Sequence, residues 1–249
     1  MSFIYQLALF TNRRLKTTLR SPAMLMMTLM TPLIYLLFFA PLLEKFSGSY
    51  AIVLDQFMPG MLILTAFTVG MGTGWYIVDD DTRHLIEQFR VMPIRPAAYI
   101  GGTVLYDVIG FLVPAGLLIA GAAWAGFKLH WFGLLTLLVL GTLFTLTVSA
   151  LIAGIGLVLR NTGAVGGVVS GIQLPLMLLS GVMLPISYGP TWIQNLAKFN
   201  PMYYVVRAAQ NLNAEDFQTK WVLWGFSLTI VLMVVSLLWS TKKYRKLAI

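Results

Sequence analysis

The sequence contains no cysteine and only two histidines, His84 and His130. Without cysteine the chain can form no disulfide, no cysteine-ligated zinc site and no iron–sulfur cluster. No lysine follows a glycine, so the chain lacks the Gly-x-x-x-x-Gly-Lys-[Ser/Thr] loop that holds nucleotide phosphates. We therefore predict no catalytic residue, no metal site and no cofactor bound by this chain.

Charge is also scarce, because 10% of the residues are charged and 58% are hydrophobic. Soluble domains carry about 25% charged residues, and so little polar surface could not cover a globule in water. The chain is therefore predicted to be an integral membrane protein. Its formal net charge of +8 is interpreted through the positions of the basic residues, and no nucleic-acid partner is predicted.

Six apolar runs are long enough to cross a bilayer as helices, since a hydrocarbon core of about 30 Å needs about 20 residues. The predicted fold class is all-α, a single transmembrane domain of six helices over residues 1–249 with both termini on the same side. The predicted spans are residues 22–43, 56–78, 99–127, 132–158, 164–184 and 220–241.

The lysines and arginines orient these spans. Twelve of the 17 fall in the terminal segments, in residues 79–98 and after the fourth span. Because basic residues concentrate in cytoplasmic loops, both termini are predicted to be cytoplasmic in a bacterial plasma (inner) membrane. The two histidines then lie on opposite sides, which excludes a two-histidine metal site. The five basic residues predicted outside are Lys45, Lys128, Lys198, Arg207 and Lys220.

Residues 1–21 predict a helix lying in the membrane interface. Phe3, Leu7 and Phe10 recur at helical spacing on one side, and the basic residues that follow suit anionic headgroups. A frayed basic tail is the alternative. These basic residues are Arg13, Arg14, Lys16 and Arg20.

Residues 185–219 form the long outer connection before the last span. Prolines interrupt it, which rules out a full crossing, and its tryptophan and tyrosines favour the headgroup level. Two short re-entrant helices, covered by protein, are one interpretation. A structured extracellular loop lying on the surface is the other.

Residues 79–98 gather four of the nine acids and three arginines between two apolar runs. Asp79, Asp80 and Asp81 are predicted to begin a helix, where carboxylates cap N–H groups and favour the positive dipole end. Pro93 is predicted to end it. The pattern predicts a short amphipathic helix with Leu85, Ile86, Phe89 and Met92 on one face, and Arg83, Glu87 and Arg90 on the other. It could lie on the bilayer or dock a cytoplasmic partner.

Four motifs in order along the chain resemble the permease subunit of type-2 ABC exporters. They are FMPGMLI at the opening of the second span, IEQFRVMPIRPAAYIGG leading into the third, GVMLPIS after the fifth, and KFNPMYYVVRA. The resemblance covers nearly the whole chain. It implies that residues 79–98 hold the coupling helix, seated in an ATP-binding subunit on another polypeptide, with residues 1–21 as the connecting helix.

The resemblance also implies partners and site residues. The partners would be two copies of an ABC ATPase, which bind ATP and Mg, and a second permease, identical or related. Phe89, Arg90 and Pro93 resemble the branch that exports drugs, antibiotics and similar amphiphiles, although the polysaccharide-exporting branch is built similarly. The ATPase-coupling residues would be Arg83, Glu87, Phe89, Arg90 and Pro93.

Asp107 is the only acid well inside an apolar run, and an intramembrane charge defaults to a functional hypothesis. A substrate contact, a proton relay or a hinge could use it. An acid that reaches the cytoplasmic edge, or one paired with a buried tyrosine or arginine, is the structural alternative. Gln173 and Ser180 are further candidates to line a substrate pathway.

Gly163, Gly167 and Gly171 form a GxxxGxxxG pattern, which lets two helix backbones approach closely. The contact could lie within the subunit or between two permeases. The resemblance favours the second, with Met27 and its neighbouring methionines in the first span as the other wall.

Two rival functions stay open at this stage. An ion-gradient-driven secondary carrier would use Asp107 as its ion or proton site. A non-transporting membrane scaffold or immunity protein would use none of these residues.

Overall fold

The computed structural model describes residues 2–19, 30, 34, 50–90, 95–124, 127, 130–182 and 186–247, and all regular structure in these ranges is helical. The predicted all-α class is confirmed for this part of the chain. The helices are α1 (Phe3–Leu19), α3 (Tyr50–Met71), α4 (Thr73–Thr82), α5 (Leu85–Arg90), α6 (Pro96–Trp124), α7 (Trp131–Leu159), α8 (Thr162–Leu178), α9 (Thr191–Ala197), α10 (Pro201–Asn213) and α11 (Lys220–Leu247), with a 3₁₀ turn at Ile186–Tyr188.

Four stretches within the described residues are long and apolar enough to cross a membrane. They correspond to the second, third, fourth and sixth predicted spans. The fifth predicted span is α8, an apolar helix of 17 residues that ends at Leu178. The first, residues 22–43, lies almost wholly outside the described residues, so the total of six stays a prediction. The four stretches are Phe57–Thr82, Pro96–Trp124, Trp131–Leu159 and Lys220–Lys246.

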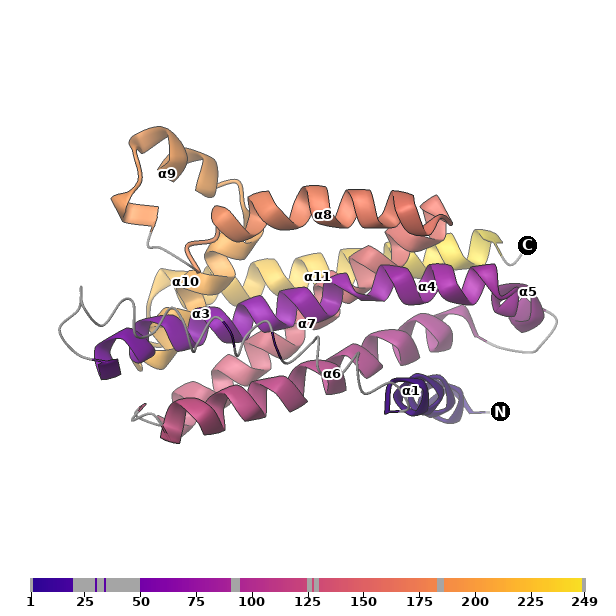
Figure 1. Ribbon diagram of the computed structural model, residues 1–249, viewed down its shortest axis with the longest axis horizontal. Helices are drawn as coiled ribbons and strands as arrows, with labels where there is room; N and C mark the ends of the chain where they lie inside the picture. Colours follow the sequence, from indigo (N-terminus) through magenta and orange to yellow (C-terminus); the bar gives the residue numbers. More distant parts are fainter. Residues whose placement is uncertain are drawn as a thin grey trace.

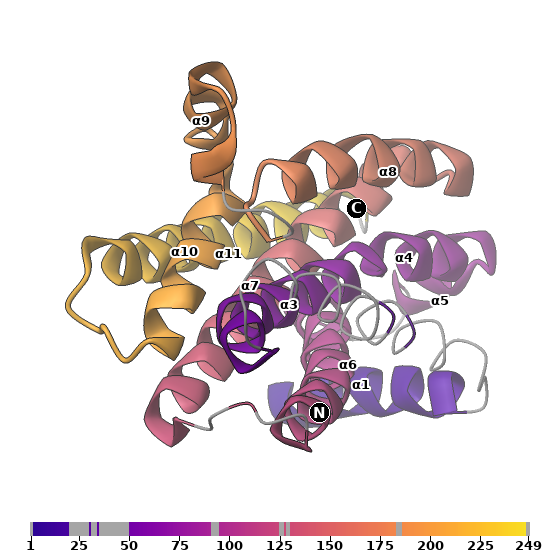
Figure 2. The same cartoon turned by 60° about the vertical axis from the view of Figure 1, so that its left-hand side comes forward.

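The long helices lie side by side along the longest axis of the molecule (Figure 1). α1 is seen end-on in Figure 1 and lengthwise in Figure 2, so it crosses the direction of the other helices. α5 and both chain termini lie at one end of the bundle, and α9 projects from the other (Figure 1). This placement suits an interfacial α1, since a helix across the span direction runs along a membrane surface.

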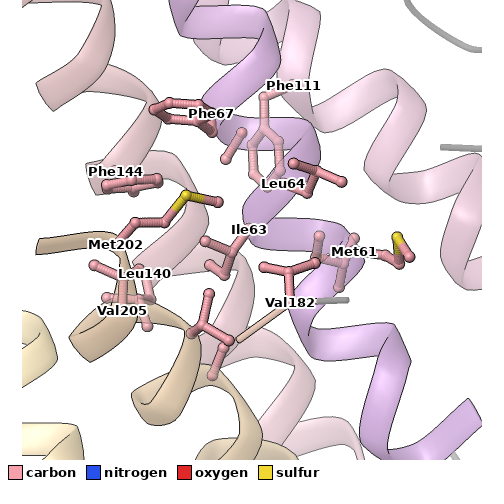
Figure 3. Packing of buried hydrophobic residues seen from close by; sticks show 14 of the residues in the cluster. Met61, Ile63, Leu64, Phe67, Phe111, Leu140, Phe144, Val182, Met202 and Val205 are labelled. Carbon is pink, nitrogen blue, oxygen red and sulfur yellow. The ribbon is translucent and has the colours of Figure 1, made fainter. Parts of the chain in front are cut away.

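The main hydrophobic core joins α3, α6, α7 and α10 (Figure 3). Phe67 of α3 and Phe144 of α7 stack with ring centroids 6.1 Å apart, and Met202 of α10 belongs to the same buried cluster. α10 fits closely because its neighbours are glycines. A Cβ added at Gly133 would lie 2.4 Å from the Leu212 carbonyl oxygen, and one at Gly225 would lie 2.4 Å from the Ala208 Cβ.

A break at Gly72 divides the second span into α3 and α4. The Gly72 N–H bonds the Val69 carbonyl at 3.1 Å, a tighter i to i+3 turn. Gly70 and Gly74 flank the break as packing positions, since added Cβ atoms would lie 2.8 Å from the Val148 Cβ and 2.7 Å from the Val165 Cγ1 respectively. The glycines therefore hold α3 and α4 close against α7 and α8.

Candidate functional site

The corner between α4 and α5 lies where the second span leaves the bundle. The expectation that Asp79, Asp80 and Asp81 begin a helix is wrong, because they occupy the last turns of α4. His84, with φ of 56°, turns the chain between α4 and α5. The three carboxylates do not act as N-caps because each binds an arginine side chain instead.

Asp80 is the most buried of the three carboxylates. Its Oδ1 accepts a hydrogen bond from Arg13 Nη2 at 2.7 Å, and its Oδ2 accepts from Arg14 Nη2 at 2.9 Å. The Tyr99 hydroxyl of α6 donates to the same Oδ2 at 2.9 Å. Arg14 also lies over the Tyr76 ring, with its Cζ 5.0 Å from the ring centroid. One carboxylate of α4 thereby fastens both α1 and α6.

Asp81 and Asp79 bind in more exposed surroundings. Arg160, in a left-handed conformation at the end of α7, donates from Nη2 to Asp81 Oδ1 at 2.6 Å and from Nε to Oδ2 at 2.9 Å. This two-bond geometry fixes the orientation of both groups. Asp79 pairs locally with Arg83 at 3.0 Å, and both side chains are exposed. The α4 end is thus tied to α7 as well.

α1 is docked on the first turns of α6 by backbone contacts. Thr11 Oγ1 lies 3.0 Å from the Gly102 carbonyl oxygen, and the Arg95 N–H donates to Gln6 Oε1 at 3.1 Å. A Cβ at Gly102 would lie 2.6 Å from the Phe10 Cβ, so only glycine permits this approach. Phe10 faces the protein and not lipid, which corrects its predicted membrane-facing role. Arg13 and Arg14 likewise bind Asp80, although they were expected to meet headgroups.

α5 is anchored by Ile86, which is buried in a second hydrophobic cluster. That cluster draws members from α1, α4, α6, α7 and α11. Together with the three aspartate pairs, the burial of Ile86 ties the corner to several membrane helices. The cluster members are Phe10, Ile77, Ile86, Tyr99, Ile100, Val104, Ala150, Ala153, Leu157 and Tyr244.

The predicted coupling residues all belong to this corner by sequence. Arg83 is exposed and pairs with Asp79. Glu87, Phe89 and Arg90 lie in α5, but their side chains lie outside what the structure describes. Pro93 lies outside the described residues altogether. α5 covers only Leu85–Arg90, so the single amphipathic helix predicted from the aspartates onward is replaced by two helices and a turn.

Asp107 is buried inside the bundle, where it receives a hydrogen bond from the Thr73 hydroxyl. Thr73 Oγ1 also lies 2.9 Å from the Gly70 carbonyl oxygen. The acid is therefore paired with a buried hydroxyl at the start of α4. Pairing with a tyrosine or an arginine was one of the expected alternatives; the partner is instead a threonine, which lies beside the helix break.

The other two pathway candidates have local roles. Ser180 is buried at the end of α8, where its Oγ donates to the Met177 carbonyl at 2.6 Å and accepts from the Val182 N–H at 3.2 Å. Gln173 is half-buried on α8. No hydrogen bond joins Asp107, Gln173 and Ser180 to one another in the described part of the chain, so the structure does not gather them into one site.

The glycine pattern of α8 is not packed against any other helix in the part of the chain that the structure describes. No described atom lies within 4 Å of a Cβ built at Gly167 or Gly171, and the nearest to one at Gly163 is the Asn161 Oδ1 of its own helix cap at 3.3 Å. Packing of these glycines against the described part of the subunit is therefore not seen. Met27, the proposed other wall, lies outside the described residues.

Comparison with known proteins identifies the family. The sequence profile of the ABC-2 type transporter family matches residues 5–214. The chain belongs to the ABC-2 type transporter family. It is thus a multi-pass membrane protein and a transport subunit, and ABC-2 permeases work with an ATP-binding subunit.

Curated relatives of this ABC-2 permease are distant. It is 26% identical over 198 residues to the daunorubicin resistance ABC transporter permease protein DrrB1 of Streptomyces coeruleorubidus, covering 77% of this chain and 69% of that protein. It is 24% identical over 245 residues to the putative transport permease ycf38 of Pyropia yezoensis, covering 92% and 79%. The corresponding protein of Cyanophora paradoxa is 25% identical over 227 residues, covering 86% and 76%.

Proposed function

We propose that this ABC-2 permease is the membrane subunit of an ATP-driven exporter. Its ATP-binding subunit would contact the α4–α5 corner and displace it during the ATPase cycle. The observation that supports this most is the burial of Ile86 in a cluster shared by five helices, together with the three aspartate–arginine pairs at the end of α4. Transmission of motion needs α5 to be packed firmly against the membrane helices, since a loosely attached α5 would move without moving the bundle.

The proposed mechanism is a shift between two arrangements of the bundle. ATP-bound, closed ATPases would bind one position of the corner better, and hydrolysis would favour the other. The corner would then carry motion to α1 through Asp80, and to α7 through Asp81 and Arg160. In this proposal both termini and α5 are cytoplasmic in a bacterial plasma membrane, which agrees with their common end in Figure 1.

The proposed cargo is a drug, an antibiotic or another amphiphile. The support is the daunorubicin resistance permease among the relatives and the Phe89, Arg90 and Pro93 pattern in this chain. The cargo would leave between two permeases, identical or related, served by two ATPase copies. The glycine face of α8, on which no described helix packs, supports a helix from a second permease packing there. The secondary-carrier alternative would use Asp107, which is the buried acceptor of the Thr73 hydroxyl and is joined by no hydrogen bond to Gln173 or Ser180 among the described residues.

The test of coupling uses the intact permease–ATPase complex. Glu87→Ala and Arg90→Ala should lower transport-linked ATPase activity about 5- to 150-fold, the range of a typical coupling free energy, while membrane insertion stays normal. Lys198→Ala is the matched control, because this exposed residue bonds Asn195 on α9 at the far end of the bundle. Coupling that survives both α5 changes, or that Lys198→Ala lowers equally, contradicts the proposal.

A further inference from the structure

Arg207 of α10 packs on aromatic rings, in contrast to the arginines that bind aspartates. Its guanidinium carbon lies 5.4 Å from the Tyr203 ring centroid and 5.7 Å from the Trp221 centroid. Tyr203 and Trp221 meet edge to face with centroids 5.9 Å apart, and Tyr204 lies 6.1 Å from Trp221. These rings form an aromatic shelf, residues Tyr203, Tyr204 and Trp221, that holds the cation in one place.

The charge of Arg207 has no carboxylate within ion-pair distance among the residues the structure describes. Arg13, Arg14, Arg83 and Arg160 all pair with aspartates, whereas Arg207 does not. Glu215, an acid at the same end of the bundle, lies 3.2 Å from His130. Within the described residues the Arg207 guanidinium makes these ring contacts and no hydrogen bond or ion pair, so its N–H groups can donate to an oxyanion.

The depth of Arg207 follows from its neighbour Trp221. Trp221 lies in the first turn of α11, a helix that begins at Lys220 and is apolar enough to cross the membrane. A residue beside that turn lies at the level of the headgroups, where tryptophan and tyrosine concentrate. Beyond the buried Val222, α11 exposes the large apolar side chains of Leu223 and Trp224. Acyl chains would cover them.

We propose that Arg207 and its aromatic shelf bind the phosphate of a phospholipid at the end of the bundle opposite α5. The guanidinium fork donates two parallel hydrogen bonds to the phosphate oxygens, which is the geometry that arginine favours. The acyl chains of that phospholipid pack against Leu223 and Trp224. This lipid site is independent of the proposed export function, because it requires only that α11 spans a bilayer.

The test measures phospholipid bound to the purified permease–ATPase complex by native mass spectrometry while phosphatidylglycerol is added. Arg207→Gln should weaken the tightest phospholipid binding about tenfold, the loss expected for one hydrogen-bonded charge. Arg207→Lys should weaken phospholipid binding less than Arg207→Gln, because lysine keeps the positive charge. Some loss should remain, because lysine lacks the planar guanidinium that donates two parallel hydrogen bonds. Lys198→Gln, which removes an exposed charge at the same end of the bundle, is the matched control and should leave binding unchanged.

A second variant and a second ligand complete the test. Trp221→Leu removes part of the shelf but keeps Arg207, so it should also weaken phospholipid binding even if Arg207→Gln fails to fold. Equal phospholipid binding in the wild type, Arg207→Gln and Trp221→Leu overturns the proposal. Inorganic phosphate alone is the last probe. If it stabilises the wild type but not Arg207→Gln, while lipid binding is equal, the site takes a free anion and the lipid assignment is wrong.

Discussion

Substitution of the three consecutive aspartates tests whether the corner is held as the structure shows. Asp79, Asp80 and Asp81 have side chains that are 54%, 6% and 13% exposed. Each change to asparagine removes the same charge from the same helix, so only the surroundings differ. Loss of stability should therefore follow burial, with Asp80→Asn largest, Asp81→Asn intermediate and Asp79→Asn smallest.

The magnitudes follow from what each substitution leaves behind. Asp80→Asn leaves the charge of Arg14, whose side chain is 10% exposed, without its carboxylate, and removing one partner of a buried pair costs about 3–5 kcal/mol. For a chain of this size that corresponds to a fall in melting temperature of about 6–20 °C. Asp79→Asn breaks an exposed pair and should change stability by no more than about 0.5 kcal/mol.

The assay is thermal unfolding of the purified protein in one detergent, read by tryptophan fluorescence. A double-substitution cycle adds a second check. The coupling energy of Arg14 with Asp80 should exceed that of Arg13 with Asp80, because the Arg13 side chain is 35% exposed and reaches water. The reasoning is refuted if Asp79→Asn destabilises as much as Asp80→Asn, or if Arg14 and Asp80 contribute independently.

Substitutions at four other positions test separate contacts. Gly102→Ala should displace α1 and lower the melting temperature, because its Cβ would meet backbone and a Cβ, while Gly101→Ala should be tolerated, since its Cβ meets only a side-chain methyl at 3.3 Å. Asp107→Val should change the free energy of thermal unfolding by no more than about 1 kcal/mol, because the Thr73 hydroxyl keeps the Gly70 carbonyl as an acceptor, and Asp107→Asn should retain the bond to Thr73. Gly167→Leu meets no atom of the described residues, so it should leave the melting temperature unchanged but reduce cross-linking between permeases; a fall in melting temperature with normal cross-linking would contradict this.

The membrane spans could be predicted from the sequence because a bilayer imposes length and hydropathy directly. Three of the predicted spans, 99–127, 132–158 and 220–241, correspond to α6, α7 and α11. α10 was also foreseeable as a short helix, since Asn200 caps its Met202 N–H and Pro201 occupies its first position.

The aspartate run shows where sequence reasoning failed. Acids in a row favour a helix start through the dipole, and that local rule gave the wrong end of α4. The partners that decide the structure, Arg14 and Arg160, lie 66 and 79 residues away in the sequence. Charge pairing over such separations leaves no periodic pattern. Phe10 was expected to face the membrane, but it contacts Tyr99. This difference also arises from a contact between residues far apart in the sequence.

The central claim is that the α4–α5 corner touches the ATP-binding subunit. Because the chain has no native cysteine, Gln88→Cys places a single thiol on an exposed position of α5, and Tyr188→Cys places one at a position 84% exposed beyond α8. A short maleimide–amine cross-linker, applied to membranes containing the complete transporter, should join the Gln88→Cys permease to the ATP-binding subunit and leave the Tyr188→Cys permease unjoined. Cross-linking through Tyr188→Cys, with none through Gln88→Cys, would contradict the account.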